Sequence, residues 1–471
     1  MRREHLAAFV VASLALWPAL ASAGVPDGPL QPYGVEVECD PVCEEEAHAA
    51  SDALRAGESE VLQVENAELV SRLEALERKL SDGPGQPQAV SQGPRPAPGP
   101  RRPVVPLRPT LLGETDYRVY PAEEEGRTGF ALARLRPGLI LSPVDWFRGV
   151  ATVEFAGKNP IILDAYARFS PLSWLDLSLG YAKPPLFASF INEPVYAIPF
   201  PGRAPVVGAF RVRRDLGVDA HFRPAALPVE GWARVGNGTG SALGNDNALP
   251  AGYAALDLVF GRAHSARPGA ADATWGLRLG VAGLYENTED REGIAGTTPL
   301  GFRYYRPVIV SGERKVGEAH LVGYAGPLRL TVEGAIAREA RSRDTDGNPS
   351  TPRQSLPAIT SYGLSTEIAW TLFGTRRQVG RAPLPDAASV WEGGALELAV
   401  RYDGMWLGRG ADDVVEGGSQ GGALALVWWP THFLAASAAG YLTRYDQPAL
   451  ERPDGRWSWG VLGRVRFFWG Y

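Results

Sequence analysis

The last nine residues of the chain read "GRVRFFWGY" and run from Gly463 to Tyr471. Large apolar and aromatic side chains alternate there with cationic ones, which is the two-residue period of a β-strand. The apolar face comprises Val465, Phe467, Trp469 and Tyr471, and the opposite face carries Arg464 and Arg466. Such an end would be an exposed aggregation edge in a soluble domain. We therefore expect a last strand that closes a sheet against the first strand.

The same alternation recurs along residues 113–471, in runs such as "IILDAYARF", "WLDLSLGY", "LRLTVEGAI" and "ALELAVRYD". A β-sandwich would also alternate, but three details favour a membrane barrel. The polar faces carry charges of both signs, and short connections alternate with long ones. Aromatic residues gather at strand ends, as at Tyr181, Trp370 and Trp428 with Trp429. The pattern predicts an all-β fold, a transmembrane antiparallel β-barrel over residues 113–471.

The first 23 residues have the composition of a secretory signal peptide. Arg2 and Arg3 precede an apolar stretch from Leu6 to Leu20, and small residues end it at Ala21–Ala23. A membrane anchor is the alternative, but the apolar run is short and the cleavage site is good. No later stretch supplies the roughly 20 consecutive apolar residues of a spanning helix. We expect export and cleavage after Ala23.

Between the signal and the barrel we distinguish three segments. Residues 24–50 are irregular and contain Cys39 and Cys43, residues 51–81 have a helical pattern, and residues 82–112 form a linker rich in proline and glycine. The two cysteines could pair with each other or cross-link chains in an oxidising compartment. With only His48 nearby, no metal site is expected.

The helical segment fits heptads. Its seam consists of Leu62, Asn66, Leu69, Leu73, Leu76 and Leu80. An amphipathic helix packed on a domain would look similar, but a proline-rich linker follows instead of a domain. We interpret the segment as a coiled coil that oligomerises the chain, located in the periplasm.

Composition excludes several functions. The net charge of −6 and the pI near 5.7 give no basic excess for nucleic acid. None of the histidines lies in a recognisable Ser/His or metal-ligand motif. A hydrolase built on His320 and Ser311 is the best enzymatic alternative, and the pattern disfavours it. We expect no enzyme activity and no cofactor.

Five stretches, in order, resemble the phosphate-selective porin O and P family of bacterial outer-membrane porins. They are "LSLGYAKPPL" (177–186), "FRVRRDLGVDAHF" (210–222), "GWARVGNGTG" (231–240), "WEGGALELAVRYD" (391–403) and "QGGALALVWWPTHFLAASAAGYL" (420–442). The resemblance implies about 16 strands, a homotrimer and an aqueous pore that favours anions. The ending with Phe467, Trp469 and Tyr471 also resembles the signal read by the barrel-assembly machinery. The chain departs from the family in having only four lysines, which weakens the case for phosphate.

A cationic cluster is the candidate selectivity site, and it comprises Lys183, Arg203, Arg211, Arg213 and Arg214. Arg203 lies in "AIPFPGRAPVVGA" (197–209), a segment rich in proline and glycine that could fold inward and narrow the lumen. We expect Arg211 and Arg213 to share a strand face, with Arg214 opposite. Guanidinium groups suit phosphate or carboxylate oxygens. The alternative is that these arginines pair with Asp215, Asp219 and other lumen carboxylates.

The sequence thus predicts an outer-membrane porin for passive diffusion of small hydrophilic solutes, anionic or neutral, in contact with outer-membrane lipid. The alternative function is structural, a barrel that tethers the envelope through its periplasmic coiled coil.

Overall fold

A computed structural model describes residues 107–121, 128–211, 213–238, 249–263, 274–344, 352–374, 381–383, 394–447 and 455–470. Several sequence predictions lie outside these residues. They are the signal peptide, Cys39 and Cys43, the heptad seam, most of the linker, and Tyr471. No helix among the described residues is long and apolar enough to cross a membrane.

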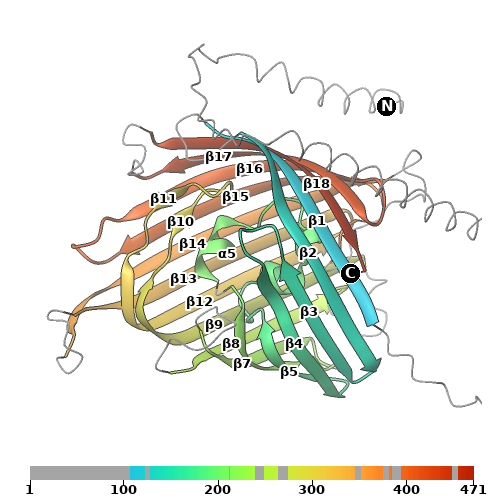
Figure 1. The fold of residues 1–471 in the computed structure, drawn as a ribbon, viewed down its shortest axis with the longest axis horizontal. Coiled ribbons are helices and arrows are strands. Elements are labelled where there is room, and N and C mark those ends of the chain that lie inside the picture. Colours follow the sequence, from blue (N-terminus) through green and yellow to red (C-terminus); the bar gives the residue numbers. More distant parts are fainter. Residues whose placement is uncertain are drawn as a thin grey trace, which may run out of the picture. The chain divides into compact units, whose positions relative to one another are not determined.

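Sixteen antiparallel strands form a closed barrel, as the sequence and its family resemblance predict (Figure 1). Each barrel strand pairs with the barrel strands before and after it in the chain, and β1 pairs with β18 to close the ring. Between β9 and β12, which pair with each other, the chain forms a small separate hairpin. The barrel strands are β1 (Leu107–Val119), β2 (Gly129–Val144), β3 (Phe147–Glu154), β4 (Ile161–Leu172), β5 (Leu175–Ala182), β6 (Asp215–Phe222), β7 (Val229–Gly236), β8 (Ala251–Gly261), β9 (Trp275–Glu292), β12 (Ile309–Ala325), β13 (Leu328–Arg343), β14 (Gln354–Phe373), β15 (Ala395–Arg409), β16 (Gly417–Trp429), β17 (Leu434–Tyr445) and β18 (Trp457–Trp469).

The last strand closes the barrel against the first, as predicted from the final residues. Gly113 of β1 lies opposite Phe467 of β18, and Thr115 lies opposite Val465. Val465 and Trp469 are 56% and 54% exposed on the outside, whereas Arg464 and Arg466 are buried inside. The predicted assignment of the two faces of this strand is therefore confirmed.

The first strand begins at Leu107, earlier than the boundary expected at Gly113. Pro109 lies within this strand, although proline is typical of the linker that precedes it. It pairs with Leu139 of β2, but β18 reaches only as far as Leu111. Among the described residues, Pro109 thus lies beyond the last β1–β18 pair, and the end of a ladder tolerates a missing N–H.

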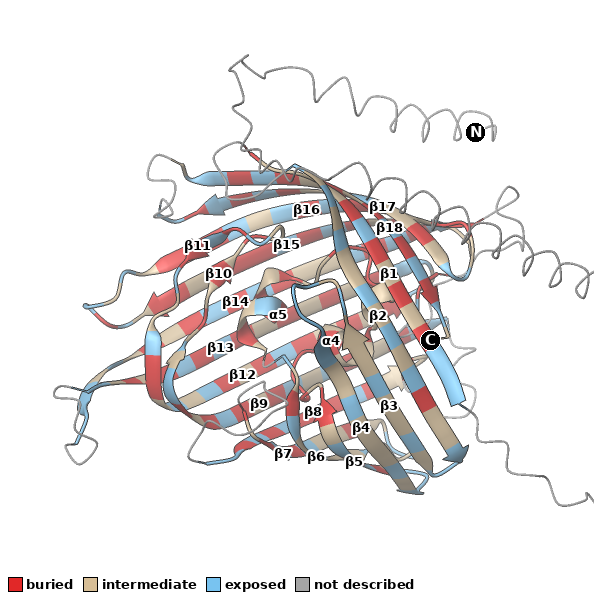
Figure 2. Cartoon of the chain, in the orientation of Figure 1, coloured by how far each residue is buried: buried red, intermediate tan, exposed pale blue. Residues whose placement is uncertain are grey.

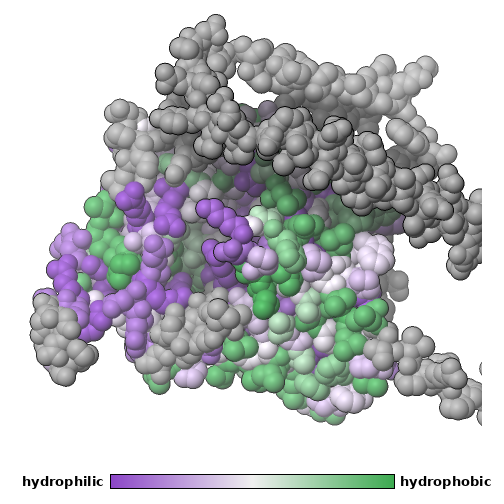
Figure 3. Space-filling view, in the orientation of Figure 1, coloured by the Kyte–Doolittle hydropathy of each residue, from purple (hydrophilic) through white to green (hydrophobic). Residues whose placement is uncertain are grey.

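Burial alternates along the strands, as the two-residue period requires (Figure 2). Outward-facing residues include large exposed apolar side chains such as Leu179, Val281 and Val400. Hydrophobic residues gather over the outer face of β2–β5 (Figure 3). Most of the charged residues buried in the described part of the chain lie on the inward faces. This inside-out distribution is that of a barrel in lipid around a polar interior.

Two connections fold into the barrel. Both enter from the barrel end that lies opposite the end of β18 at Trp469. Residues 183–214 join β5 to β6 and contain α4 (Ala188–Asn192), η1 (Val195–Ala197) and α5 (Pro205–Phe210). Residues 293–308 join β9 to β12 and contain the hairpin β10 (Gly296–Thr297) and β11 (Arg303–Tyr305). We call the first the inner segment and the second the inner hairpin.

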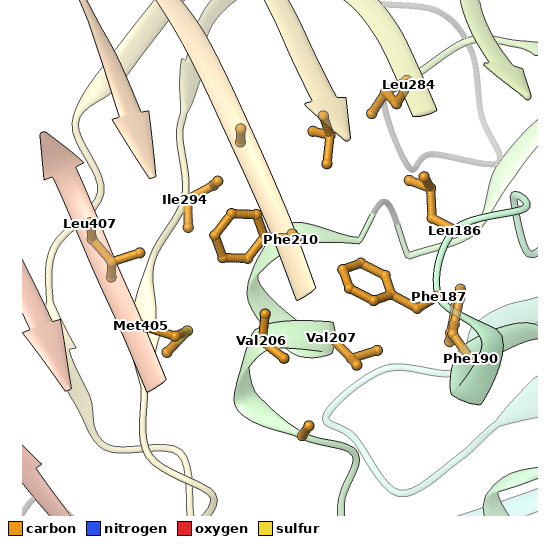
Figure 4. Packing of buried hydrophobic residues seen from close by; sticks show 14 of the residues in the cluster. Leu186, Phe187, Phe190, Val206, Val207, Phe210, Leu284, Ile294, Met405 and Leu407 are labelled. Carbon is orange, nitrogen blue, oxygen red and sulfur yellow. The ribbon is translucent and has the colours of Figure 1, made fainter. Parts of the chain in front are cut away.

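An apolar cluster joins the inner segment, the inner hairpin and the wall (Figure 4). Val206 and Phe210 of α5 belong to it, with Ile294 beside the hairpin and Met405 and Leu407 of β15. Val206 and Phe210 are fully buried. The inner segment is therefore packed across the lumen, where the sequence predicted a narrowing.

Candidate functional site

Arginines of the wall fix the inner segment by its backbone carbonyls. Arg466 of β18 donates to the carbonyl oxygens of Tyr196 at 2.8 Å and Ile198 at 3.3 Å. Arg401 of β15 donates to the carbonyl of Gly202 at 3.1 Å. Arg464 of β18 and Arg134 of β2 both donate to the carbonyl of Pro201. Residues 196–202 contain three prolines or glycines and form few hydrogen bonds among themselves. Their backbone carbonyls therefore take hydrogen-bond donors from the arginines of the barrel wall.

Two carboxylates of β1 orient these arginines. Asp116 accepts from Arg464 Nε at 2.6 Å and Nη2 at 2.9 Å. Glu114 accepts from Arg466 Nε at 2.6 Å and lies 2.7 Å from Arg464 Nη1. Both carboxylate side chains are fully buried. This cluster of Glu114, Asp116, Arg464 and Arg466 at the seam of the barrel is called the closure cluster below.

Carboxylates on the far wall fix the beginning of the inner segment. Glu333 of β13 accepts from the Ser189 backbone N–H at 2.8 Å and from its hydroxyl at 2.7 Å. Arg329 of β13 contacts Glu193 of the segment and Glu367 of β14. The segment is thus anchored to the wall at the β1–β18 seam, at β2 and at β13, which holds it across the lumen.

Three of the five predicted cationic residues surround one aromatic ring. The Phe190 ring centroid lies 4.4 Å from the Arg211 guanidinium, 5.5 Å from that of Arg203 and 5.0 Å from Lys183 Nζ. Cations are attracted to the ring face, so Phe190 holds three like charges together. Lys183 Nζ also donates to the Phe190 carbonyl at 2.8 Å. We call Lys183, Arg203 and Arg211 the cationic triad.

The triad lacks a full set of counter-charges. Arg203 donates to the carbonyls of Ser189 and Glu193, but Arg211 Nε has no hydrogen-bond partner among the described residues. Burial, reinforced by the charge of Arg203, lowers the pKa of Arg211 to about 9. Burial and the same arginine lower the pKa of Lys183 well below its usual value. An anion beside the triad would relieve this repulsion.

The other two predicted residues differ from expectation. Arg211, Arg213 and Arg214 precede β6, which begins at Asp215, so the predicted shared strand face of Arg211 and Arg213 is wrong. The helix α5 ends at Phe210, and Arg211, Arg213 and Arg214 belong to no helix or strand. Arg213 is exposed, and it makes no ion pair within the described part of the chain. Arg214 pairs with Asp164 of β4 at 2.9 Å.

The predicted alternative partners are engaged elsewhere. Asp219 pairs with Arg234 of β7 at 2.7 Å. Asp215 accepts from Tyr253 at 3.1 Å and from the Gly238 N–H at 2.8 Å. The arginines of the cluster therefore pair only in part with carboxylates, through Arg214 and Asp164.

Sequence reasoning missed a second group of lumen cations. Arg148 of β3 lies directly opposite Arg168 of β4 on the inner face. Neither arginine forms an ion pair with a carboxylate among the residues that the structure describes. Like charges facing each other across two strands are unfavourable unless water or an anion intervenes. The alternation of the strands places both inside, but their register could not be read from sequence.

His320 does not belong to a hydrolase site. Its Nδ1 lies 3.0 Å from Glu318 and its Nε2 lies 3.3 Å from Asp257. Ser311 lies on the same strand, β12, and not on an adjacent one as the alternative required. No group of three or more His, Cys, Asp or Glu residues in the described ranges could hold a metal ion.

No sequence family profile and no curated protein matches the chain. Solved structures do resemble it. The in-vitro folded OmpT of Vibrio cholerae in its trimer form is 12% identical and covers 77% of this chain and 99% of its own, with a TM-score of 0.48. DcaP of Acinetobacter baumannii, an outer membrane channel, is 13% identical over 78% of this chain and 97% of its own, with a TM-score of 0.48.

An anion-selective porin from Comamonas acidovorans is 11% identical over 77% of this chain and 99% of its own, with a TM-score of 0.48. At such low identity these likenesses concern the fold alone. Membership of the phosphate-selective porin family remains a prediction from the sequence motifs.

Proposed function

We propose that the chain forms a water-filled channel in the bacterial outer membrane, through which small hydrophilic solutes diffuse passively. The observation that carries this proposal is the inside-out barrel, with exposed apolar strands around a charged interior. The inner segment and inner hairpin narrow that interior. Following the sequence resemblance, we propose a homotrimer as its assembly.

We further propose that the channel prefers anions. Charge rings and width at the constriction set the selectivity of such pores. The cationic triad is incompletely paired, Arg213 is exposed without an ion pair in the described ranges, and Arg148 faces Arg168. Guanidinium groups present paired donors that match phosphate and carboxylate oxygens. These residues would attract anions from both sides of the inner segment.

Reversing one triad charge should reduce this preference. In planar bilayers under a potassium chloride gradient, the native channel should give a reversal potential on the anion side. Arg211→Glu should shift the reversal potential toward the value of a cation-preferring channel, since it replaces an incompletely paired positive charge by a negative one. The shift should be largest at about 0.01–0.1 M salt, where the screening length is roughly 30 to 10 Å.

Arg353→Glu is the matched control, because Arg353 is an exposed arginine that pairs with Asp290. It should leave the potential nearly unchanged. Equal effects of Arg211→Glu and Arg353→Glu, or a cation preference in the native channel, would contradict the role of the triad. The native protein failing to conduct would contradict the channel itself.

The anion preference should fall as pH rises, because the lowered pKa of Lys183 lets this residue lose its charge below the usual lysine range. The charge is present at pH below the lowered pKa and is lost as pH rises through it. Lys183→Met should therefore weaken the preference in acid and change it little near the usual lysine pKa of about 10.4. Reversal potentials measured across this range in both proteins test the point. If the reversal potential of Lys183→Met changed with pH as it does in the native protein, the titrating group would not be Lys183.

A further inference from the structure

A small pocket lies where both inward connections meet the wall. Pro205 of the inner segment and Thr297 and Thr298 of the inner hairpin form one side. The wall contributes Asp403 of β15, Ser419 of β16 and Thr443 of β17. The cavity has a volume of about 10 Å³. That is about the space needed for one water molecule or one bare cation of similar size.

Asp403 has one carboxylate oxygen that the structure leaves without a partner. Oδ2 accepts from Arg401 Nε at 2.9 Å. Oδ1 is buried and has no hydrogen-bond partner among the described residues, and the residue as a whole is 8% exposed. A buried ionised oxygen without a donor is costly, so an occupant of the pocket that compensates it is strongly favoured.

The pocket is also lined by hydroxyl oxygens that can act as ligands, together with proline, glycine and alanine residues. The Ser419 hydroxyl bonds the Tyr304 hydroxyl at 2.7 Å, and Thr298 Oγ1 accepts from the Phe302 N–H at 3.1 Å. Each of these oxygens retains a lone pair. Arg401 is ion-paired with Asp403 through Oδ2, directs Nη1 to the Gly202 carbonyl and stacks on Phe200, and it does not line the pocket. Its Nη2 also has no hydrogen-bond partner among the described residues, so the ion pair leaves Oδ1 without a donor.

We propose that this pocket binds a single monovalent alkali cation between Asp403 and the hydroxyls of the inner hairpin and wall. Hard cations prefer carboxylate and hydroxyl oxygens. A divalent ion would require more than the one carboxylate present. The inference goes beyond solute passage, because the ion would tie Thr298 of the inner hairpin to the wall.

Anomalous diffraction tests the site directly. Crystals of the full-length mature protein in detergent, soaked in rubidium chloride, should show an anomalous peak within ligand distance of Asp403 Oδ1. Asp403→Asn should abolish the peak. Density without an anomalous signal would mean that the pocket holds only water and would overturn the proposal, whether or not the protein conducts.

Thermal unfolding gives an independent measurement. At equal ionic strength, replacing N-methylglucamine chloride by potassium chloride should raise Tm by about 2 °C, since an ion that binds only the folded state stabilises it. Asp403→Asn should lose this difference, and Thr298→Val should reduce it while leaving the wall carboxylate in place. Asp412→Asn, an exposed carboxylate in the β15–β16 loop, should retain it. Equal potassium dependence in Asp403→Asn and Asp412→Asn would refute the site.

Discussion

Arg464→Ala should destabilise the barrel by about 3 kcal/mol, because it removes one member of a buried charge network and leaves its partners uncompensated. Arg464 bonds Asp116 through two nitrogens and approaches Glu114, and both carboxylates have fully buried side chains. Glu114 keeps Arg466 and Arg134, and Asp116 keeps Arg118, so the loss should lie toward the lower end for broken buried pairs. Urea unfolding in lipid vesicles, followed by tryptophan fluorescence, measures this free energy.

The closure cluster also joins the two ends of the barrel sequence. Arg464 and Asp116 lie 348 residues apart and meet across the β1–β18 seam. Arg464→Lys should reduce the free energy of unfolding by less than Arg464→Ala does, because the positive charge remains. It should still reduce it, since an ammonium cannot reproduce the forked geometry of the guanidinium. Arg353→Ala, which breaks an exposed pair with Asp290, should change stability by only about 0–1 kcal/mol. A loss in Arg464→Ala no larger than in this control would show that the cluster does not stabilise the seam.

The period of the strands could be predicted because it depends only on neighbours in sequence. The two faces of β18 follow from alternation at Val465 and Arg464, and the inward turn of the inner segment follows from its proline and glycine content. The register could not be predicted. It is register that places Arg148 opposite Arg168 and brings Arg464 to Asp116.

The anchoring role of the wall arginines was also beyond sequence reasoning. In the sequence, Arg466 and Arg401 look like generic lumen charges, because the acceptors through which they anchor the inner segment are the backbone carbonyls of Tyr196, Ile198 and Gly202. A carbonyl has no signature in the sequence. The inner hairpin was missed for a related reason. Its stretch "GTTPLGFRYY" (296–305) has the glycine and proline of a surface loop, and only tertiary packing of Tyr304 and Tyr305 against the wall turns it inward.

Gly363→Val should unseat the inner segment and raise the single-channel conductance. Gly363 lies on the inner face of β14, where a Cβ would come 2.2 Å from Val206 Cγ2 and 3.0 Å from Phe210. Val206 cannot easily turn away, because a β-branched side chain in a helix has one strongly preferred rotamer. The clash must therefore move α5 itself, breaking its contacts with Met405 and Leu407. We expect an increase on the order of two-fold, since a wider constriction passes more ions.

A graded pair of variants separates this steric effect from damage to the strand. Gly363→Ala should raise conductance less than valine, and adding Val206→Ala should return it toward the native value, because the second change removes the atom in conflict. Gly440→Val on β17 is the matched control, since nothing lies within 4 Å of a Cβ built there. All four proteins should migrate as folded barrels in unheated gels. Native conductance in folded Gly363→Val would show that α5 does not limit the passage, and failure of Val206→Ala to reverse Gly363→Ala would place the cause elsewhere than in this contact.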